Sequence, residues 1–363
     1  MTVMLRRPML SDGPSWRETN RMYADRLRAA FDCDGVDWDA AHSHVSWIDT
    51  WRKALSDNKA GVSYFIVRID GGRQRIVGHM SVAGVHARTG CAELSSWAVG
   101  IPSQLTQWAQ ACVVLDAFER HSRPHVIAPI AVSNHAPAKL ARSLGMWTIQ
   151  QQRQLRHYGG VLADHDIWIL VNDADARAKL ASIVAEIPED TATAVPRREP
   201  LRSLQQAVVI PRYLVRIARS TVRAARTKAP DVGTPIPVGS ASGEEVLLVP
   251  TRGTGGRYEV LIDGARVGHI EVAVDVGTST AELLPQLAPT LPRETGSAVV
   301  VGLAIRLAEH HGATRRTVVT TGTNDTDIAG ALAEAGFVHE GSAPPSPGDD
   351  LEERQMWTAF RDL

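Results

Sequence analysis

The sequence is poor in cysteine, in long apolar runs and in net charge. Its 363 residues include three cysteines and carry a formal net charge of −1. Three cysteines with no Cys-x-x-Cys pair exclude a disulfide framework and a cysteine zinc site. No apolar run approaches the roughly 18 residues of a transmembrane helix, and the first residues lack the apolar block of a signal peptide. A cytoplasmic location is therefore expected.

The small net charge is the sum of unequal parts. Residues 1–180 carry a net charge of +4, residues 181–235 carry +4, and residues 236–363 carry −9. Apolar residues make up 44% of the chain and charged residues 22%. These values are typical of a folded protein and exclude a wholly disordered chain. The length predicts about two domains.

Short motifs recur along the chain at an almost constant spacing. Val77-Gly78-His79 recurs 190 residues later as Val267-Gly268-His269. Ala92-Glu93-Leu94 recurs 189 residues later as Ala281-Glu282-Leu283. One repeated tripeptide is easily explained by chance, but a series in the same order at the same spacing is not. We therefore predict two copies of one domain.

The two copies share one predicted order of elements. Apolar and polar residues alternate over 63–70 and 75–82 on either side of Gly71-Gly72, which predicts a hairpin. The second copy repeats this pattern around Asp263-Gly264. A third strand, a helix, a strand, an Asn-headed helix and a last strand follow in each copy. The expected fold is α/β (α+β), with a mixed, mostly antiparallel central sheet flanked by helices. The predicted long helices cover Trp108–His121 and Ser297–His311.

The predicted domains are residues 1–180 and 244–363, joined by a linker over 181–243. The linker contains a predicted amphipathic helix over 211–228 with arginines on one face. These are Arg212, Arg216, Arg219, Arg223 and Arg226. The favoured interpretation is that this helix packs on the acidic C-terminal domain. A membrane surface, a nucleic acid or another acidic partner are the alternatives, and no specific nucleic-acid site is expected.

A short segment before each long helix predicts a phosphate site. Residues 293–298 read RETGSA, and residues 104–109 read QLTQWA. Glycine lets a ligand approach the backbone, and a helix start offers unpaired N–H groups and the positive end of the helix dipole. The second copy therefore predicts a pyrophosphate site. In the first copy Gln107 replaces the glycine and is expected to crowd the ligand.

With this segment at this place in the strand order, the sequence resembles the GNAT family of N-acetyltransferases. The family's acetyl-CoA loop has the form Gln/Arg-x-x-Gly-x-Gly/Ala. Residues 3–172 resemble the RimJ/RimL-like branch, whereas residues 245–360 resemble a divergent GNAT domain. The motifs that carry the first resemblance are Leu5-Arg6-Arg7-Pro8, Trp97-Ala98-Val99, Asn134 eleven residues before Gly145, and Asp164-His165.

This resemblance implies a tandem GNAT protein that uses acetyl-CoA as cosubstrate. The implied reaction is acetyl transfer to a primary amine within a ternary complex. The amine is expected to be a protein N-terminus or a small cationic amine. No metal is expected, because no histidine pair has a metal-ligand spacing backed by carboxylates or cysteines. The alternative is a catalytically degenerate GNAT-fold scaffold that holds a partner through its arginine-faced helix.

The resemblance also implies which residues bind the cofactor. The second copy is expected to hold the better site, although Asn134 and Asn324 have helix capping as an alternative role. The implied cofactor residues are Arg293, Gly296, Ser297, Ala298 and Asn324 in the second copy, and Val99, Gln104, Ala109 and Asn134 in the first.

Acetyl transfer needs a proton acceptor for the amine and a proton donor for the thiolate. The candidate bases are Glu93, Glu271 and Glu282, each with a purely structural carboxylate as the alternative. The family's acid is often a hydroxyl on the Asn-headed helix, where this chain has Pro137 and Ala141. The candidate substitutes are Ser133, Ser143 and Tyr158.

Two further features have structural interpretations that we favour. His79 and His269 repeat within a strand and are expected to be core residues. The acidic segment 341–353 is expected to be a solvated loop, with attraction of a cationic amine as the alternative.

Overall fold

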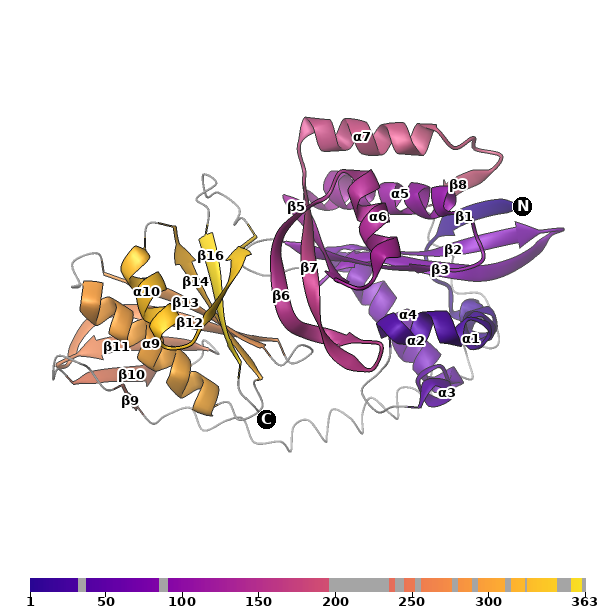
Figure 1. The fold of residues 1–363 in the computed structure, drawn as a ribbon. Coiled ribbons are helices and arrows are strands. Elements are labelled where there is room, and N and C mark those ends of the chain that lie inside the picture. Colours follow the sequence, from indigo (N-terminus) through magenta and orange to yellow (C-terminus); the bar gives the residue numbers. More distant parts are fainter. Residues whose placement is uncertain are drawn as a thin grey trace. The chain divides into compact units, whose positions relative to one another are not determined.

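A computed structural model shows two compact units (Figure 1). We call them unit 1, within residues 1–195, and unit 2, within residues 235–360. The predicted arginine-faced helix lies outside the described residues. The structure describes residues 1–31, 37–84, 91–195, 235–238, 245–251, 256–275, 280–288, 293–310, 315–323, 325–344 and 354–360.

Unit 1 is built on one mixed sheet with the strand order β8-β1-β2-β3-β4-β5-β7-β6. Neighbouring strands are antiparallel except in the pairs β8–β1 and β4–β5. The expected fold class is therefore confirmed. The strands are β1 (Thr2–Arg6), β2 (Val62–Asp70), β3 (Arg73–Ala83), β4 (Ala92–Ala98), β5 (His125–Ala131), β6 (Trp147–Tyr158), β7 (Val161–Val171) and β8 (Ala192–Val195).

Helices cover both faces of this sheet (Figure 1). Apolar residues of α5, α6 and α7 form one core with the sheet, and Ile66 of β2 belongs to it. The next residue, Phe65, points to the other face and packs with Trp16 and Trp47 of α1 and α4. The alternation follows from the two-residue period of a strand. The helices are α1 (Gly13–Met22), α2 (Ala24–Phe31), α3 (Trp38–Ala41), α4 (His44–Ala60), α5 (Ser103–His121), α6 (His135–Leu144) and α7 (Ala174–Ala185), preceded by the 3₁₀ turn η1 (Leu10–Asp12).

Unit 2 has the strand order β15-β16-β14-β13-β12-β11-β10-β9. From β10 to β16 this is the order that unit 1 shows from β1 to β7. The helices α9 and α10 hold the positions in the chain that α5 and α6 hold in unit 1. The elements are β9 (Ile236–Val238), β10 (Val246–Pro250), β11 (Arg257–Ile262), β12 (Ala265–Asp275), β13 (Thr280–Leu287), α9 (Arg293–His310), β14 (Arg316–Gly322), α10 (Thr326–Glu334), β15 (Val338–Ser342) and β16 (Arg354–Phe360).

The two sheets also share irregularities at matching positions. The β2–β3 ladder shifts register after the pair Ile66↔Gly78, and the β11–β12 ladder shifts after Val260↔Gly268. A Cβ on Gly78 would lie 2.6 Å from the carbonyl oxygen of Trp97. A Cβ on Gly268 would lie 2.5 Å from that of Gln286. Both bulges therefore need glycine for the same steric reason.

Several element boundaries predicted from the sequence differ from those in the structure. α5 begins at Ser103 and α9 at Arg293, five and four residues before the predicted starts. Strand β6 of unit 1 and strand β15 of unit 2 were not predicted; each pairs antiparallel with the strand that follows it in the chain, β7 and β16. Unit 1 also extends past residue 180, because β8 pairs with β1.

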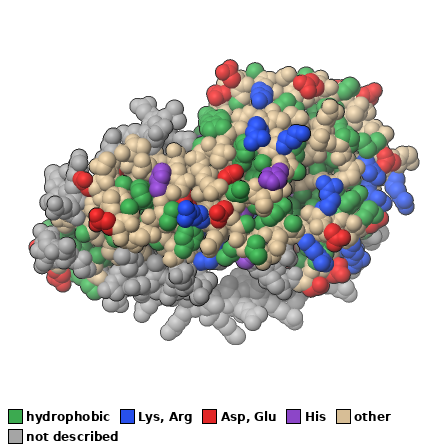
Figure 2. Space-filling model, in the orientation of Figure 1, with side chains coloured by type: hydrophobic (Ala, Val, Ile, Leu, Met, Phe, Trp, Pro, Cys, Tyr) green, Lys and Arg blue, Asp and Glu red, His purple; other side chains and the backbone are tan. Residues whose placement is uncertain are grey.

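The face of the described residues drawn in Figure 2 is mixed in charge. Figure 2 shows basic and acidic side chains interspersed over the face drawn. Within the described ranges, no helix is long and apolar enough to cross a bilayer.

Candidate functional site

Strands β4 and β5 of unit 1 separate shortly after they begin. Their parallel ladder consists of the pairs Ala92↔Val126 and Glu93↔Ile127. β5 nevertheless continues beside β7 along its whole length. From Leu94 onward, therefore, one edge of β4 is not paired with β5. An unpaired strand edge presents backbone N–H and C=O groups to a ligand.

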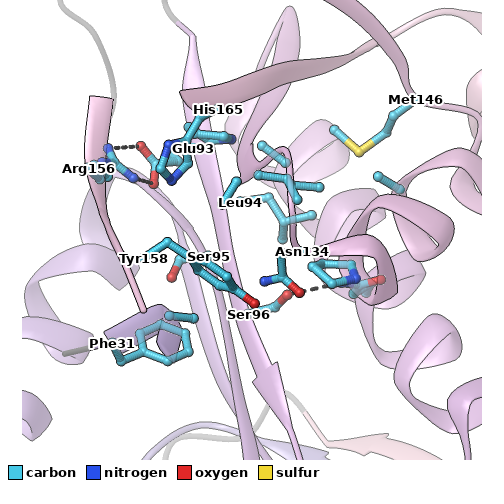
Figure 3. A pocket seen from close by; sticks show the side chains of 18 of the residues that line it. Phe31, Glu93, Leu94, Ser95, Ser96, Asn134, Met146, Arg156, Tyr158 and His165 are labelled. Carbon is cyan, nitrogen blue, oxygen red and sulfur yellow. Dashed lines mark hydrogen bonds and ion pairs between the residues drawn. The ribbon is translucent and has the colours of Figure 1, made fainter. Parts of the chain in front are cut away.

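A cavity of about 150 Å³ lies at this separation (Figure 3). Leu94 belongs to the core under α5, so Leu94 and Ser96 point to that face of the sheet. Glu93 and Ser95 point to the opposite face. Both sets line the cavity, which is thus bounded from both faces of the sheet. Its other walls come from α2, α5, α6, β5, β6 and β7, through Phe31, Gln110, Ala128, Pro137, Ala141, Arg156, Tyr158 and His165.

Glu93, a predicted base, lies in the cavity wall with both carboxylate oxygens engaged. Nη1 and Nη2 of Arg156 donate to Oε1 and Oε2 at 2.6 and 2.7 Å. The two side chains are 29% and 39% exposed. A bidentate pair of this geometry fixes the orientation of the carboxylate. This is the arrangement expected of a structural carboxylate.

His165 of β7 lies beside this ion pair (Figure 3). The residue is 6% exposed. Its Nδ1 is 2.8 Å from the carbonyl oxygen of Ala163 and must carry the hydrogen, because a carbonyl only accepts. Burial lowers the pKa of His165. Sequence reasoning noted His165 within a motif but not as a site residue.

Three hydroxyl groups reach the cavity, from Ser95, Ser96 and Tyr158. The ring of Tyr158 extends toward Ser96 and Asn134 (Figure 3). Tyr158 was among the predicted substitutes for the missing acid. The others are placed differently, since Ser133 is not a lining residue and Ser143 Oγ donates to the Leu140 carbonyl at 2.7 Å.

Two amides also face the cavity. Asn134 is the N-cap residue of α6, but its side chain makes no capping hydrogen bond. Its amide therefore remains available to the cavity. Gln110 is 4% exposed; its Nε2 donates to Ser96 Oγ at 3.0 Å, whereas its Oε1 has no partner. A buried acceptor without a donor is costly, so a ligand N–H at this point would be stabilised.

Solved acetyltransferase structures resemble the first half of the chain. Mycobacterium smegmatis RimJ in complex with CoA-disulfide is 17% identical, with 49% of this chain and 87% of that chain covered and a TM-score of 0.44. The ribosomal L7/L12 α-N-protein acetyltransferase RimL with coenzyme A is 15% identical, with 48% and 97% covered and a TM-score of 0.42. A variant of the Vibrio cholerae spermidine N-acetyltransferase SpeG is 13% identical, with 49% and 96% covered and a TM-score of 0.38. No protein-family model and no curated protein sequence matches the chain.

The remaining predicted cofactor residues of unit 1 lie at the end of β4 and the start of α5. Gln104 is exposed in the first helical turn. Ala109 is fully buried in the core, and Val99 is buried with its N–H bonded to the Val77 carbonyl. Of these side chains, that of Gln104 alone is free to meet a phosphate at the helix start.

In unit 2 the predicted phosphate segment is not a loop. Arg293 begins α9, so Gly296, Ser297 and Ala298 lie in its first two turns, and Gly296 and Ser297 are buried. The side chain of Arg293 and the whole of Asn324 lie outside what the structure describes. These unit 2 assignments stay predictions.

The candidate bases of unit 2 lie on neighbouring strands. β13 and β14 pair over four positions, and Glu282 is one of them, opposite Val318. Its Oε1 accepts from Thr320 Oγ1 at 3.4 Å. Glu271 of β12 lies with Oε1 3.8 Å from Nε2 of His269. Both residues stay candidates.

The repeated histidines have different surroundings, since His269 lies beside Glu271 whereas His79 contacts Ser63 and Phe65. His79 Nε2 lies 2.8 Å from Ser63 Oγ, and its ring meets Phe65 edge-on at 5.2 Å. Burial lowers the pKa of His79 to about 4. These contacts are those of a core histidine. Among the described residues, no three His, Cys, Asp or Glu side chains form a group that would hold a metal ion.

Proposed function

We propose that the chain is an N-acetyltransferase that moves the acetyl group of acetyl-CoA to a primary amine in the cavity of unit 1. The observation that carries this proposal is the cavity between the separating strands β4 and β5, lined from both faces of the sheet. Donor and acceptor can reach such a cavity from opposite faces. This geometry supports direct transfer within a ternary complex.

The donor side is the face that carries α5 and α6. An extended ligand with amide groups can pair with the free edge of β4 in the manner of an added strand. The pantetheine arm of coenzyme A has two such amides. The start of α5, with exposed Gln104, is suited to the pyrophosphate through its unpaired N–H groups.

The acceptor side is the face that carries Glu93, Arg156, His165 and Tyr158. It combines an aromatic hydroxyl, a histidine and an ion pair, which suits a polar amine. We propose a protein N-terminus or a small cationic amine. Unit 2 is proposed to be a second GNAT-like domain, on the basis of its shared strand order and bulges.

The experiment is isothermal titration of the full chain with acetyl-CoA, using two charge variants. Gln104→Glu adds an anion at the start of α5 with almost no change in shape, and Ala298→Glu adds one near the start of α9. An added charge near the pyrophosphate should cost about 1 kcal/mol or more, which is roughly fivefold in Kd. We expect Gln104→Glu to weaken binding and Ala298→Glu to leave it unchanged.

The other outcomes separate the rival hypotheses. Weakening by Ala298→Glu alone would place the donor in unit 2, where the sequence predicts it. No binding of acetyl-CoA by the wild-type chain would favour the degenerate scaffold. Acetyl transfer is followed with two probes, a peptide with a free N-terminal alanine and spermidine.

A further inference from the structure

The orientation of His165 leaves one ring nitrogen available to the cavity. Since Nδ1–H donates to the Ala163 carbonyl, Nε2 of the neutral ring carries the lone pair. The residue is buried in the protein but lines the cavity. A ligand in the cavity can therefore meet this nitrogen while bulk water is largely excluded.

Glu93, by contrast, is held in an ion pair. Both of its oxygens accept from Arg156. Taking up a further proton would weaken two charge-assisted hydrogen bonds. Glu93 is thus better suited to hold Arg156 and to shape the cavity than to receive a proton.

The charges around His165 come from three strands. Burial is the largest cause of its lowered pKa, and Arg156 of β6 adds to it. Glu93 of β4 and Asp164 of β7 act in the opposite direction, as does the bond to Ala163. The net effect lowers the pKa of His165, which keeps the ring neutral at neutral pH. A neutral imidazole is the form that accepts a proton.

We propose that His165 is the catalytic base that accepts the proton of the acceptor amine through Nε2. This inference rests on the proposed acetyl transfer. The amine nitrogen forms a bond to the acetyl carbonyl carbon, the carbon–sulfur bond breaks, and the sulfur leaves as a thiolate with the bonding electrons. The surplus proton of the amine passes to Nε2, and the thiolate takes a proton from the Tyr158 hydroxyl or from water.

The first test compares His165→Gln with the matched control His121→Gln, a substitution at the far end of α5. Acetyl transfer to the alanine peptide and to spermidine is measured in the full chain as a function of pH. We expect His165→Gln to lower kcat/KM by roughly 10²- to 10⁴-fold while the Kd for acetyl-CoA stays within about twofold. The control should match the wild type.

The shape of the pH profile separates chemistry from structure. At low pH the wild-type log kcat/KM should fall with a slope of two against pH. One unit of slope comes from protonation of the amine and one from protonation of His165. The slope of His165→Gln should be one. His165→Ala should regain activity with added imidazole, because the small base can occupy the vacated space.

Several results would overturn the inference. If the wild type transfers acetyl and His165→Gln does so at the same rate, His165 is not the base, whereas the proposed function stands. A loss of rate with an unchanged slope of two and no imidazole rescue would show a structural role. A wild-type chain that neither binds acetyl-CoA nor transfers acetyl would overturn both proposals.

Discussion

A buried histidine at the start of β5 makes the stability of unit 1 depend on pH. His125 is 2% exposed, and its Nε2 has no hydrogen-bond partner. Burial lowers its pKa from 6.5 to about 4. Between these two values the unfolded chain binds a proton that the folded chain does not. Stability is therefore complete above pH 6.5 and is lost progressively as the pH falls toward 4.

The size of the effect follows from the two pKa values. Each pKa unit corresponds to about 1.4 kcal/mol. Acidification from about pH 7.5 to about pH 5 protonates the unfolded histidine almost fully and the folded one hardly at all. The expected loss from His125 is about 2 kcal/mol of unfolding free energy.

The assay is urea unfolding of the full chain at both pH values, followed by tryptophan fluorescence. His125→Gln removes the titrating group. The variant's loss of unfolding free energy on acidification should therefore be about 2 kcal/mol smaller than that of the wild type. His135→Gln, at the exposed start of α6, serves as the control and should keep the wild-type dependence. Equal losses in the wild type and His125→Gln would refute the reasoning, as would an NMR titration of His125 with a midpoint near 6.5.

Two further predictions concern stability. Glu340 is buried in unit 2 against Arg316, so Glu340→Ala removes the anion that this buried guanidinium faces and should cost about 3–5 kcal/mol in urea unfolding; a loss below about 1 kcal/mol would contradict this. Gly78→Ala should destabilise by about 1–3 kcal/mol, because its Cβ meets the Trp97 carbonyl. Gly330→Ala, in α10 with open space around it, should instead stabilise by about 0.5–1 kcal/mol, and stabilisation by both substitutions would show that the bulge is not sterically constrained.

The sequence predicted those parts of the fold that local chemistry determines. Both hairpins turn at the expected dipeptides, where Gly71, Gly72, Asp263 and Gly264 all have positive φ. Such turns need residues that tolerate this conformation. Strand β6 was missed because its residues are mostly polar and show no alternation. Its pairing with β7, rather than its own pattern, makes it a strand.

The site was predicted only in part, and the cause is not the same as for the missed strand. Glu93, Asn134 and Tyr158 were named from the sequence and line the cavity. Whether a strand residue faces a cavity depends on where β4 and β5 separate, and no local pattern shows that. The pairing of Glu93 with Arg156, 63 residues further along, is likewise a product of the tertiary fold.

The two bulge glycines bear on which residues of these sheets can be exchanged. A buried side chain can be exchanged when its neighbours repack, so its identity drifts over many generations. No repacking makes room for a Cβ against a backbone carbonyl, as at Gly78 and Gly268. Mutation therefore erases the residues around these glycines sooner than the glycines themselves. A glycine at such a bulge is less free to change than the core that surrounds it.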